Sequence, residues 1–335
     1  MSRTLKLSLL LACAVAISSA LSHTLALWLH IETETGKLGT FGTAGASSRA
    51  FVAGSSLALD GIAWPRIAGE LSQSILMWGV AGSSPWEWQV LQERARDVRV
   101  TYLVVSPYDM NEQFLCDFHA NVVPLSLTIQ QLWQSSVHSH FWKRVLSAYP
   151  LKYVRKLFPT AGRSQGVLTG LRSKLQRYLG TADVEGGPVL RLARERGANL
   201  KISDWSADRA LRRLASMRSA CQGSHSFNGP KRLALLRMLR TAGQQGEVVV
   251  IVLPVSPLYG GEFLTPEVCA EFEKMVADSK QCNPQARWIR LDELEALKSN
   301  DYYSDLVHLN MYGQQIATAA LLPELHGLVA KVGSR

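Results

Sequence analysis

The sequence predicts an α/β protein built on a mostly parallel sheet, and two observations carry that prediction. First, five short apolar runs are rich in β-branched residues and show little polar alternation, which is typical of strands buried on both faces. They lie at 50–54, 74–80, 98–106, 247–256 and 287–291. Second, helix-period patterns lie between them, as in 85–97 and 265–280, which begin at Pro85 and at the Thr265-Pro266 pair. Strands that alternate with helices favour a parallel sheet covered by helices.

The first 30 residues predict a membrane anchor or a signal peptide. Arg3 and Lys6 precede an apolar stretch over residues 7–29, close to the ~20 residues that span a bilayer. Small residues at 18–20 favour cleavage, whereas the continuing run TLALWL favours an uncleaved anchor. Basic residues before the run and acidic residues after it predict a cytoplasmic N-terminus. In a bacterium this is a single inner-membrane span with a periplasmic body, or an exported body if the segment is cleaved.

The remaining chain divides into three parts. A Gly/Ser/Thr-rich linker is expected at 31–48, an α/β domain at 49–110 and 241–335, and a helical insertion at 111–240. Residues 143–240 hold 21 Lys and Arg against 5 Asp and Glu, whereas the rest of the chain holds 15 against 22. This basic block is either a solvated helical face or a surface that docks on anionic lipid or glycan. The basic residues of this block are not interleaved with aromatic residues and form no nucleic-acid-binding motif, so nucleic acid is not an expected partner.

Cysteine and histidine usage indicates neither a metal nor a cofactor. No CxxC motif occurs, and His138 and His140 have no third ligand at a sensible spacing. Cys269 and Cys282 flank one predicted helix and would pair only if its ends folded back.

Polar residues follow the predicted strands, at the edge where sites of parallel sheets collect. Gly54-Ser55-Ser56 follows the first strand, Gly82 the second and Asn111 the third, while DYYSDLVHLNMYG at 301–313 precedes the last predicted helix. A serine hydroxyl becomes a nucleophile when an imidazole takes its proton and a carboxylate orients that imidazole. We therefore expect Ser56, His308 and Asp305 as nucleophile, base and orienter. The alternative is a helix cap with an incidental histidine.

These blocks, in this order, resemble the SGNH hydrolases, also called GDSL esterases. The resemblance covers roughly 50–110 and 245–325, and it implies a flavodoxin-like three-layer sandwich. It does not explain the helical insertion, which comes in addition to that fold. It implies the same triad, with an oxyanion hole made by the N–H groups of Ser56 and Gly82 and by the Asn111 side chain. Two blocks depart from the family pattern: Ser55 replaces the Asp of Gly-Asp-Ser, and SPYDMNE replaces Gly-x-Asn-Asp, so Asn111 is displaced by several residues.

The resemblance implies an exported, membrane-anchored serine esterase or O-acyltransferase. Its substrate would be an ester, above all O-acetyl groups of a cell-envelope or secreted polysaccharide. Water as the second acceptor gives an esterase, and a sugar hydroxyl gives a transferase. The alternative is a non-catalytic envelope scaffold of the same fold, whose basic insertion binds anionic lipid or glycan.

Overall fold

A computed structural model describes most of the chain. The described residues are 3–28, 38–41, 48–79, 82–93, 95, 98–113, 123–134, 145–150, 207–221 and 225–332, with a few more between 153 and 171. His138, His140 and much of the predicted basic block lie outside them, so those predictions stay open.

Six strands form one sheet in the order β1-β3-β2-β4-β5-β6, parallel except for β1. The register sets Ala53 beside Leu103 and Leu103 beside Val250, so the carboxyl ends of β2, β4 and β5 lie along one edge. The five strands predicted from the apolar runs are confirmed. Their bounds are β2 (Ser48–Gly54), β3 (Gln73–Gly79), β4 (Val100–Val105), β5 (Glu247–Val252) and β6 (Arg287–Arg290), after β1 (Leu38–Phe41).

Strand β1 corrects the predicted linker at 31–48. Its four residues, LGTF, pair antiparallel with β3. A short run with one Leu and one Phe gives almost no apolar signal, and its pairing uses the open backbone edge of β3.

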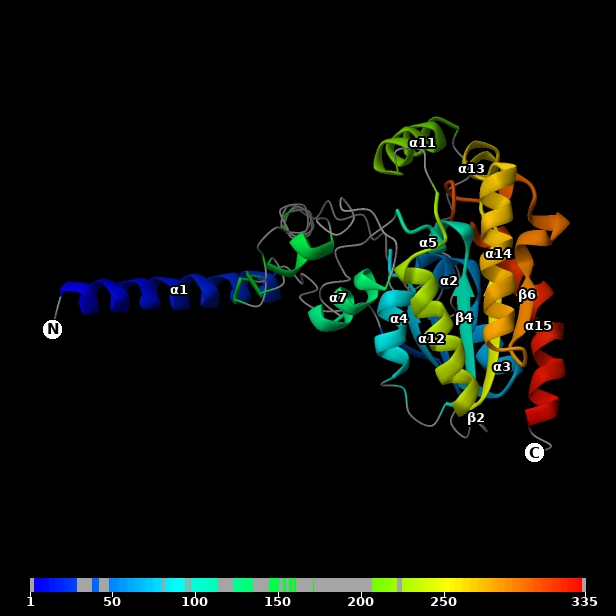
Figure 1. Cartoon of the computed structure of the whole chain (residues 1–335), viewed down its shortest axis with the longest axis horizontal. Helices are drawn as coiled ribbons and strands as arrows, with labels where there is room; N and C mark the ends of the chain where they lie inside the picture. The colour runs from blue at the N-terminus through cyan, green and yellow to red at the C-terminus, as the bar shows by residue number, and fades with distance from the viewer. Residues whose placement is uncertain are drawn as a thin grey trace, which may run out of the picture.

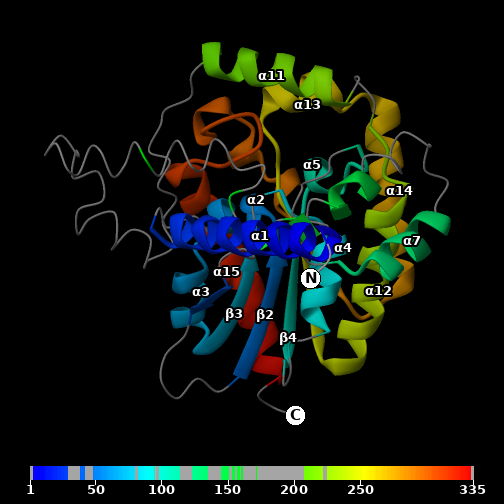
Figure 2. The same ribbon diagram turned by 90° about the vertical axis from the view of Figure 1, so that its left-hand side faces the viewer.

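Helices flank the sheet on both faces (Figures 1 and 2). Several begin at a Ser-Pro or Thr-Pro pair, where the hydroxyl accepts a backbone N–H of the first turn, as at Ser106, Ser256 and Thr265. The helices are α1 (Arg3–Trp28), α2 (Ser56–Gly61), α3 (Trp64–Glu70), α4 (Pro85–Gln92), α5 (Pro107–Met110), α7 (Leu125–Trp133), α11 (Ala207–Cys221), α12 (Pro230–Gln245), α13 (Pro257–Phe263), α14 (Pro266–Cys282) and α15 (Met311–Val332), with 3₁₀ turns at Leu291–Glu293, Glu295–Leu297 and Asn300–Tyr302.

The core has one layer on each face of the sheet. Along β5, Val249 and Ile251 face one layer, which includes residues of α2, α3 and α15, while Val248 and Val250 face the other, with α4, α12 and α14. The alternation follows from the period of two along a strand, and burial on both faces explains the continuous apolar runs. The observed class is therefore the predicted three-layer α/β sandwich.

Helix α12 lies partly within residues 111–240, which the sequence assigned to a helical insertion. It packs against α4, α14 and β5, and Leu235, Met238 and Leu239 are buried in the core. Residues 230–240 therefore belong to a layer on the sheet; of the basic residues in this range Arg240 is exposed, Arg232 and Arg237 are partly exposed, and Lys231 is buried.

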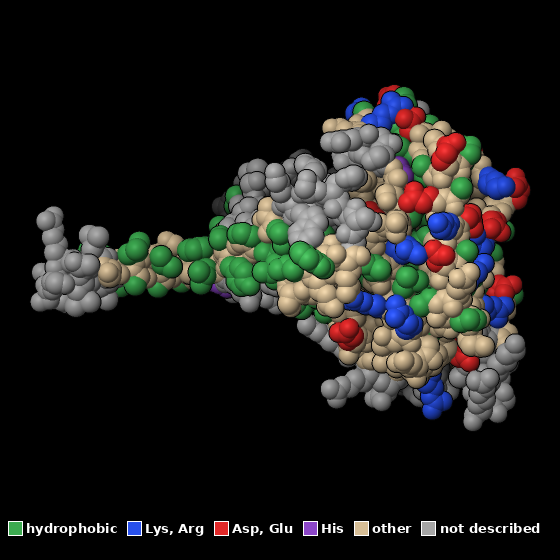
Figure 3. All heavy atoms as spheres, in the orientation of Figure 1, with side chains coloured by type: hydrophobic (Ala, Val, Ile, Leu, Met, Phe, Trp, Pro, Cys, Tyr) green, Lys and Arg blue, Asp and Glu red, His purple; other side chains and the backbone are tan. Residues whose placement is uncertain are grey.

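Helix α1 extends away from the sheet as a single rod (Figure 1) and carries apolar side chains on its surface (Figure 3). Leu10, Leu11, Ile17 and Leu21 are exposed along it. The sequence predicted a membrane span here, but within the described part of the chain no helix combines the length and apolarity needed to cross a membrane.

The two cysteines of α14 do not meet. Cys269 and Cys282 are free and lie at opposite ends of one continuous helix. Thirteen residues at ~1.5 Å of rise each keep them about 20 Å apart.

Candidate active site

The turn after β2 presents Ser56 at the first position of α2. Ser55 has extended backbone, and its side chain accepts the Leu57 N–H at 3.0 Å, which caps the helix. Gly54 allows this tight packing, because a Cβ there would lie 2.3 Å from the Cβ of Ala58. The result is a hydroxyl at a helix N-terminus whose next N–H groups, those of Leu57 and Ala58, are already bonded to Ser55.

Asp305 and His308 form a compact turn before α15. The Asp305 carboxylate accepts the N–H groups of Val307 at 3.0 Å and His308 at 2.9 Å. The Ser304 N–H donates to the His308 carbonyl at 2.9 Å and closes the turn. The Asn310 side-chain oxygen accepts the N–H groups of Tyr312 and Gly313, both at 3.0 Å, and caps the start of α15. The carboxylate thus orients the imidazole within one short segment.

The fold brings Ser56 to this pair. The Ser56 hydroxyl lies 2.8 Å from His308 Nε2, although the two residues are 252 positions apart. On the other side of the ring, Nδ1 lies 2.9 Å from both oxygens of Asp305. This is the geometry of a nucleophile, a base and an orienting acid. The side chains predicted to form a triad therefore meet, and their catalytic role stays a prediction.

The electrostatics of Asp305 suit that role. Burial acts to raise its pKa, but hydrogen bonds and charge attraction from His308, with two backbone N–H groups, lower the pKa below its usual range. Asp305 is therefore ionised at neutral pH and stabilises a positive charge on the imidazole.

Gly82 lies on the loop after β3, next to the nucleophile turn. Its φ of 74° is a left-handed conformation that favours glycine. The neighbouring Ser83 hydroxyl donates to the Gly54 carbonyl at 3.3 Å and accepts the Trp88 indole N–H at 2.9 Å. These bonds tie the loop to the end of β2. Oxyanion binding by the Gly82 and Ser56 N–H groups remains a prediction.

The structure does not place Asn111 as an oxyanion donor. Its side chain is fully buried, and its oxygen accepts the N–H groups of Gln113 and Ser226, both at 3.2 Å. The side-chain nitrogen is also buried. Asn111 is the residue that ends α5, and its side chain is held inside the protein by the backbone N–H groups of Gln113 and Ser226.

Asp109 is the residue that the sequence reasoning missed. It is buried, and its carboxylate accepts the Ser106 hydroxyl at 3.0 Å and the Ser55 hydroxyl. It also interacts electrostatically with His308. The sequence feature that could have revealed Asp109 is its position three residues after Ser106. A serine at the end of a strand commonly accepts the N–H of the residue at that spacing, as Ser106 does here.

Two hollows lie near this edge of the sheet. One of about 390 Å³ is lined by Pro107, Val255, Ser256, Leu264, Leu294 and Lys298, among others. Its wall is joined to the triad turn, because the Ser256 N–H donates to the Leu306 carbonyl at 3.0 Å.

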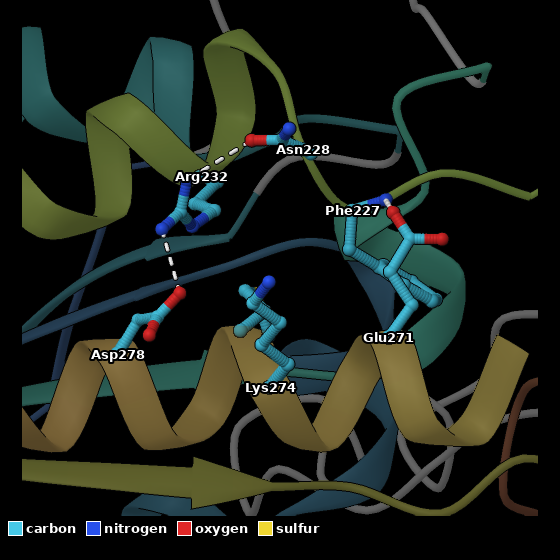
Figure 4. A pocket seen from close by; sticks show the side chains of 7 residues that line it. Phe227, Asn228, Arg232, Glu271, Lys274 and Asp278 are labelled. Carbon is cyan, nitrogen blue, oxygen red and sulfur yellow. Dashed lines mark hydrogen bonds and ion pairs between the residues drawn. The ribbon is translucent and has the colours of Figure 1, made fainter. Parts of the chain in front are cut away.

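The other hollow, of about 190 Å³, lies between α12 and α14 (Figure 4). Arg232 pairs there with Asp278 at 2.7 Å, and Glu271 accepts the Phe227 N–H at 2.9 Å. With Lys274, the lining holds two basic and two acidic side chains, so it offers no net charge to a ligand.

Trp86 and Trp88, on the helix that follows the Gly82 loop, offer no surface to a ligand, because both are completely buried in the core. Among the described residues, no group of three or more His, Cys, Asp or Glu side chains is arranged to hold a metal ion.

Comparison with known proteins finds no matching family model and no matching curated protein. Several solved structures are similar, including the following two. A carbohydrate acetylesterase family member from Sinorhizobium meliloti has 9% identity and a TM-score of 0.35, over 84% of this chain and 99% of that one. An acetylxylan esterase from Geobacillus stearothermophilus, solved as a catalytic mutant, has 10% identity and a TM-score of 0.39, over 84% and 95%. The activity of this chain is therefore inferred from its own geometry.

Proposed function

We propose that this chain is a serine esterase. The observation that carries the proposal is the 2.8 Å contact between the Ser56 hydroxyl and His308 Nε2, backed by Asp305 at 2.9 Å from Nδ1. Ser56 and His308 are 252 positions apart in the sequence, and the fold brings their side chains into contact. Their alignment suits the activation of a hydroxyl for acyl transfer.

The reaction has two steps, acylation of Ser56 and hydrolysis of the acyl group. The Ser56 oxygen attacks the ester carbonyl while His308 Nε2 takes the hydroxyl proton, and His308 then returns the proton to the departing alcohol oxygen. This leaves an acyl group on Ser56. In the second step His308 takes a proton from water, whose oxygen attacks the acyl carbon, and the proton returns to Ser56 as the acid leaves.

The charge on the carbonyl oxygen needs donors in both steps. The Ser56 N–H, at the N-terminus of α2, and the Gly82 N–H are the candidates, since Asn111 is buried. The loss of one oxyanion donor commonly costs about 10²–10³ in rate.

We infer an oxygen ester as the substrate, first of all an O-acetyl group on a cell-envelope or secreted polysaccharide. The resemblance of the sequence blocks to SGNH hydrolases supports this class. A sugar hydroxyl in place of water would make the chain an O-acyltransferase. Incubating the protein with an acetylated glycan and an unacetylated acceptor separates the two, because free acetate marks hydrolysis and acetylated acceptor marks transfer.

The test of the esterase proposal compares Ser56→Ala with Ser216→Ala, an exposed serine on α11. With a chromogenic acetyl ester, Ser56→Ala should lose about 10⁴–10⁶ of the turnover rate. Ser216→Ala should keep the wild-type rate. Equal rates for Ser56→Ala and the wild type, at equal melting temperature, would exclude this mechanism.

A non-catalytic scaffold is the second candidate, and the burial of Asn111 motivates it. In that case the basic residues dock on anionic lipid or glycan. Salt-sensitive binding to vesicles containing anionic lipid, together with no ester turnover by the wild type, would support the scaffold and reject the esterase.

We also propose that the body is exported to the bacterial cell envelope, with the N-terminal segment as its signal or membrane attachment. The basic residues before the apolar stretch support this. In a bacterial host, added protease should degrade the body in spheroplasts but not in intact cells. Protection in spheroplasts would place the body in the cytoplasm.

A further inference from the structure

A group of buried charged side chains lies behind the nucleophile turn, and the mechanism above does not use it. Asp109 and Glu112 come from α5 and its end, and Lys231 comes from the first turn of α12. Their exposed fractions are only 4%, 3% and 2%. Burying a charged group destabilises the folded state unless the group is paired and hydrogen-bonded, which points to a function for this cluster.

Asp109 connects the cluster to the triad. Its carboxylate accepts the Ser106 hydroxyl at 3.0 Å and the hydroxyl of Ser55, the residue that caps α2 and precedes the nucleophile. His308 interacts electrostatically with the same carboxylate. One acid therefore contacts the helix turn that carries the nucleophile and acts on the base.

Lys231 and Glu112 fix the other side of this arrangement. The Lys231 ammonium donates to the carbonyls of Asp109 at 2.9 Å and Asn111 at 2.6 Å. Glu112 accepts the N–H groups of Lys231 at 2.9 Å and Arg232 at 3.2 Å. The turn after β4 is thereby joined to the start of α12 by charge-assisted bonds.

The start of α12 is in turn held against α14. Arg232 binds Asp278, and the backbone of Phe227 binds Glu271 (Figure 4). Asp109 is thus supported by two packed helices, which limits its movement relative to the nucleophile turn.

Resting on the esterase function above, we propose that Asp109 is a positioning residue for the reaction. Its carboxylate holds the Ser55 hydroxyl, and so the first turn of α2, at the distance that lets the Ser56 hydroxyl meet His308. When ionised, it also stabilises the positive charge that His308 gains as it takes the proton. Asp305 orients the imidazole directly, while Asp109 acts on the nucleophile through its neighbour.

The role of Asp109 can be tested by varying the pH, because its carboxylate loses its charge in an accessible pH range. Burial raises its pKa to about 6, against the lowering effects of the Ser55 and Ser106 hydroxyls, Lys231 and His308, the groups that face it. Its charge is therefore lost in mildly acidic solution, which adds one proton to the single proton on which general-base catalysis already depends. Glu112, whose pKa burial raises to about 7, bonds to α12 and not to the nucleophile turn.

The experiment measures kcat/KM for a chromogenic acetyl ester between pH 4.5 and 8.5, for the wild type, Asp109→Asn and Glu112→Gln. The wild-type rate should fall with decreasing pH more steeply than one proton allows. Asp109→Asn should be roughly 10- to 100-fold slower at pH 7.5, because the nucleophile is less well placed, and its acid limb should fall with a slope of one. Glu112→Gln should keep the steep limb.

The outcomes separate this inference from the esterase proposal. A steep limb in Asp109→Asn, or a limb flattened equally by Glu112→Gln, overturns the inference while leaving the esterase intact. A wild type without turnover rejects both. Should Asp109→Asn fail to fold, Ser55→Ala keeps the carboxylate and removes one donor, which raises the pKa of Asp109 and should move the steep limb to higher pH. An unmoved limb in Ser55→Ala overturns the inference as well.

Discussion

Gly54→Ala should damage both stability and activity, since it acts where β2 meets α2. A Cβ at this position would lie 2.3 Å from the Cβ of Ala58 and 3.3 Å from that of Val104. Ordinary carbon contacts are ~3.5–4.0 Å, so α2 must move away from the strand by about 1 Å or more. Overpacking of this kind costs roughly 1–3 kcal/mol. A nucleophile displaced by ~1 Å loses about 100-fold in rate.

Thermal unfolding and acetyl-ester turnover measure the two effects. Gly69→Ala is the matched control, because a Cβ there meets nothing within 4 Å, and it should keep or slightly raise the melting temperature. Adding Ala58→Gly to Gly54→Ala removes the clashing methyl group and should restore part of the activity. Wild-type stability and turnover in Gly54→Ala would refute the packing described for this turn.

Three further predictions concern charge and hydrogen bonding. Asp305→Asn should lower turnover by about 10⁴. Because folding lowers the pKa of Asp305, the stability that its carboxylate contributes should be lost as the pH falls below about 4. Acid titration of the wild type and of the variant measures that loss. Folding raises the pKa of Asp109 to about 6 and of Glu112 to about 7. The free energy of unfolding should therefore decrease as the pH rises from about 4 to 7. Glu112→Gln should flatten this pH dependence in denaturant titrations, and an unchanged slope would contradict the burial of the Glu112 carboxylate. Ser83→Ala removes the acceptor of the buried Trp88 indole N–H and should cost about 1–3 kcal/mol in urea unfolding, whereas an unaltered midpoint would show that this bond is dispensable.

The sheet was predictable because its strands are buried on both faces. Runs such as 247–256 are almost uninterrupted apolar residues, and the first six residues of this run form β5, which lies between two helical layers. The same pattern cannot reveal β1, whose pairing uses the backbone edge of β3.

The candidate site was predictable only where its residues are local in sequence. The Asp305–His308 spacing and the turn at Ser56 are short motifs with direct chemical meaning, and the structure brings them together. Asn111 and Asp109 show the limit, because a single helical turn after β4 decides which side chain faces the nucleophile. Sequence spacing does not fix where that turn begins and ends.

Labelling with a fluorophosphonate probe, followed by peptide mapping, tests the central claim most directly. An activated serine reacts with the probe and retains a covalent phosphonyl group. We expect one adduct on the peptide that contains Ser56, absent in Ser56→Ala and much slower in His308→Ala. A protein that stays unlabelled, or that carries its adduct on another residue, would contradict the assignment of Ser56 as the nucleophile.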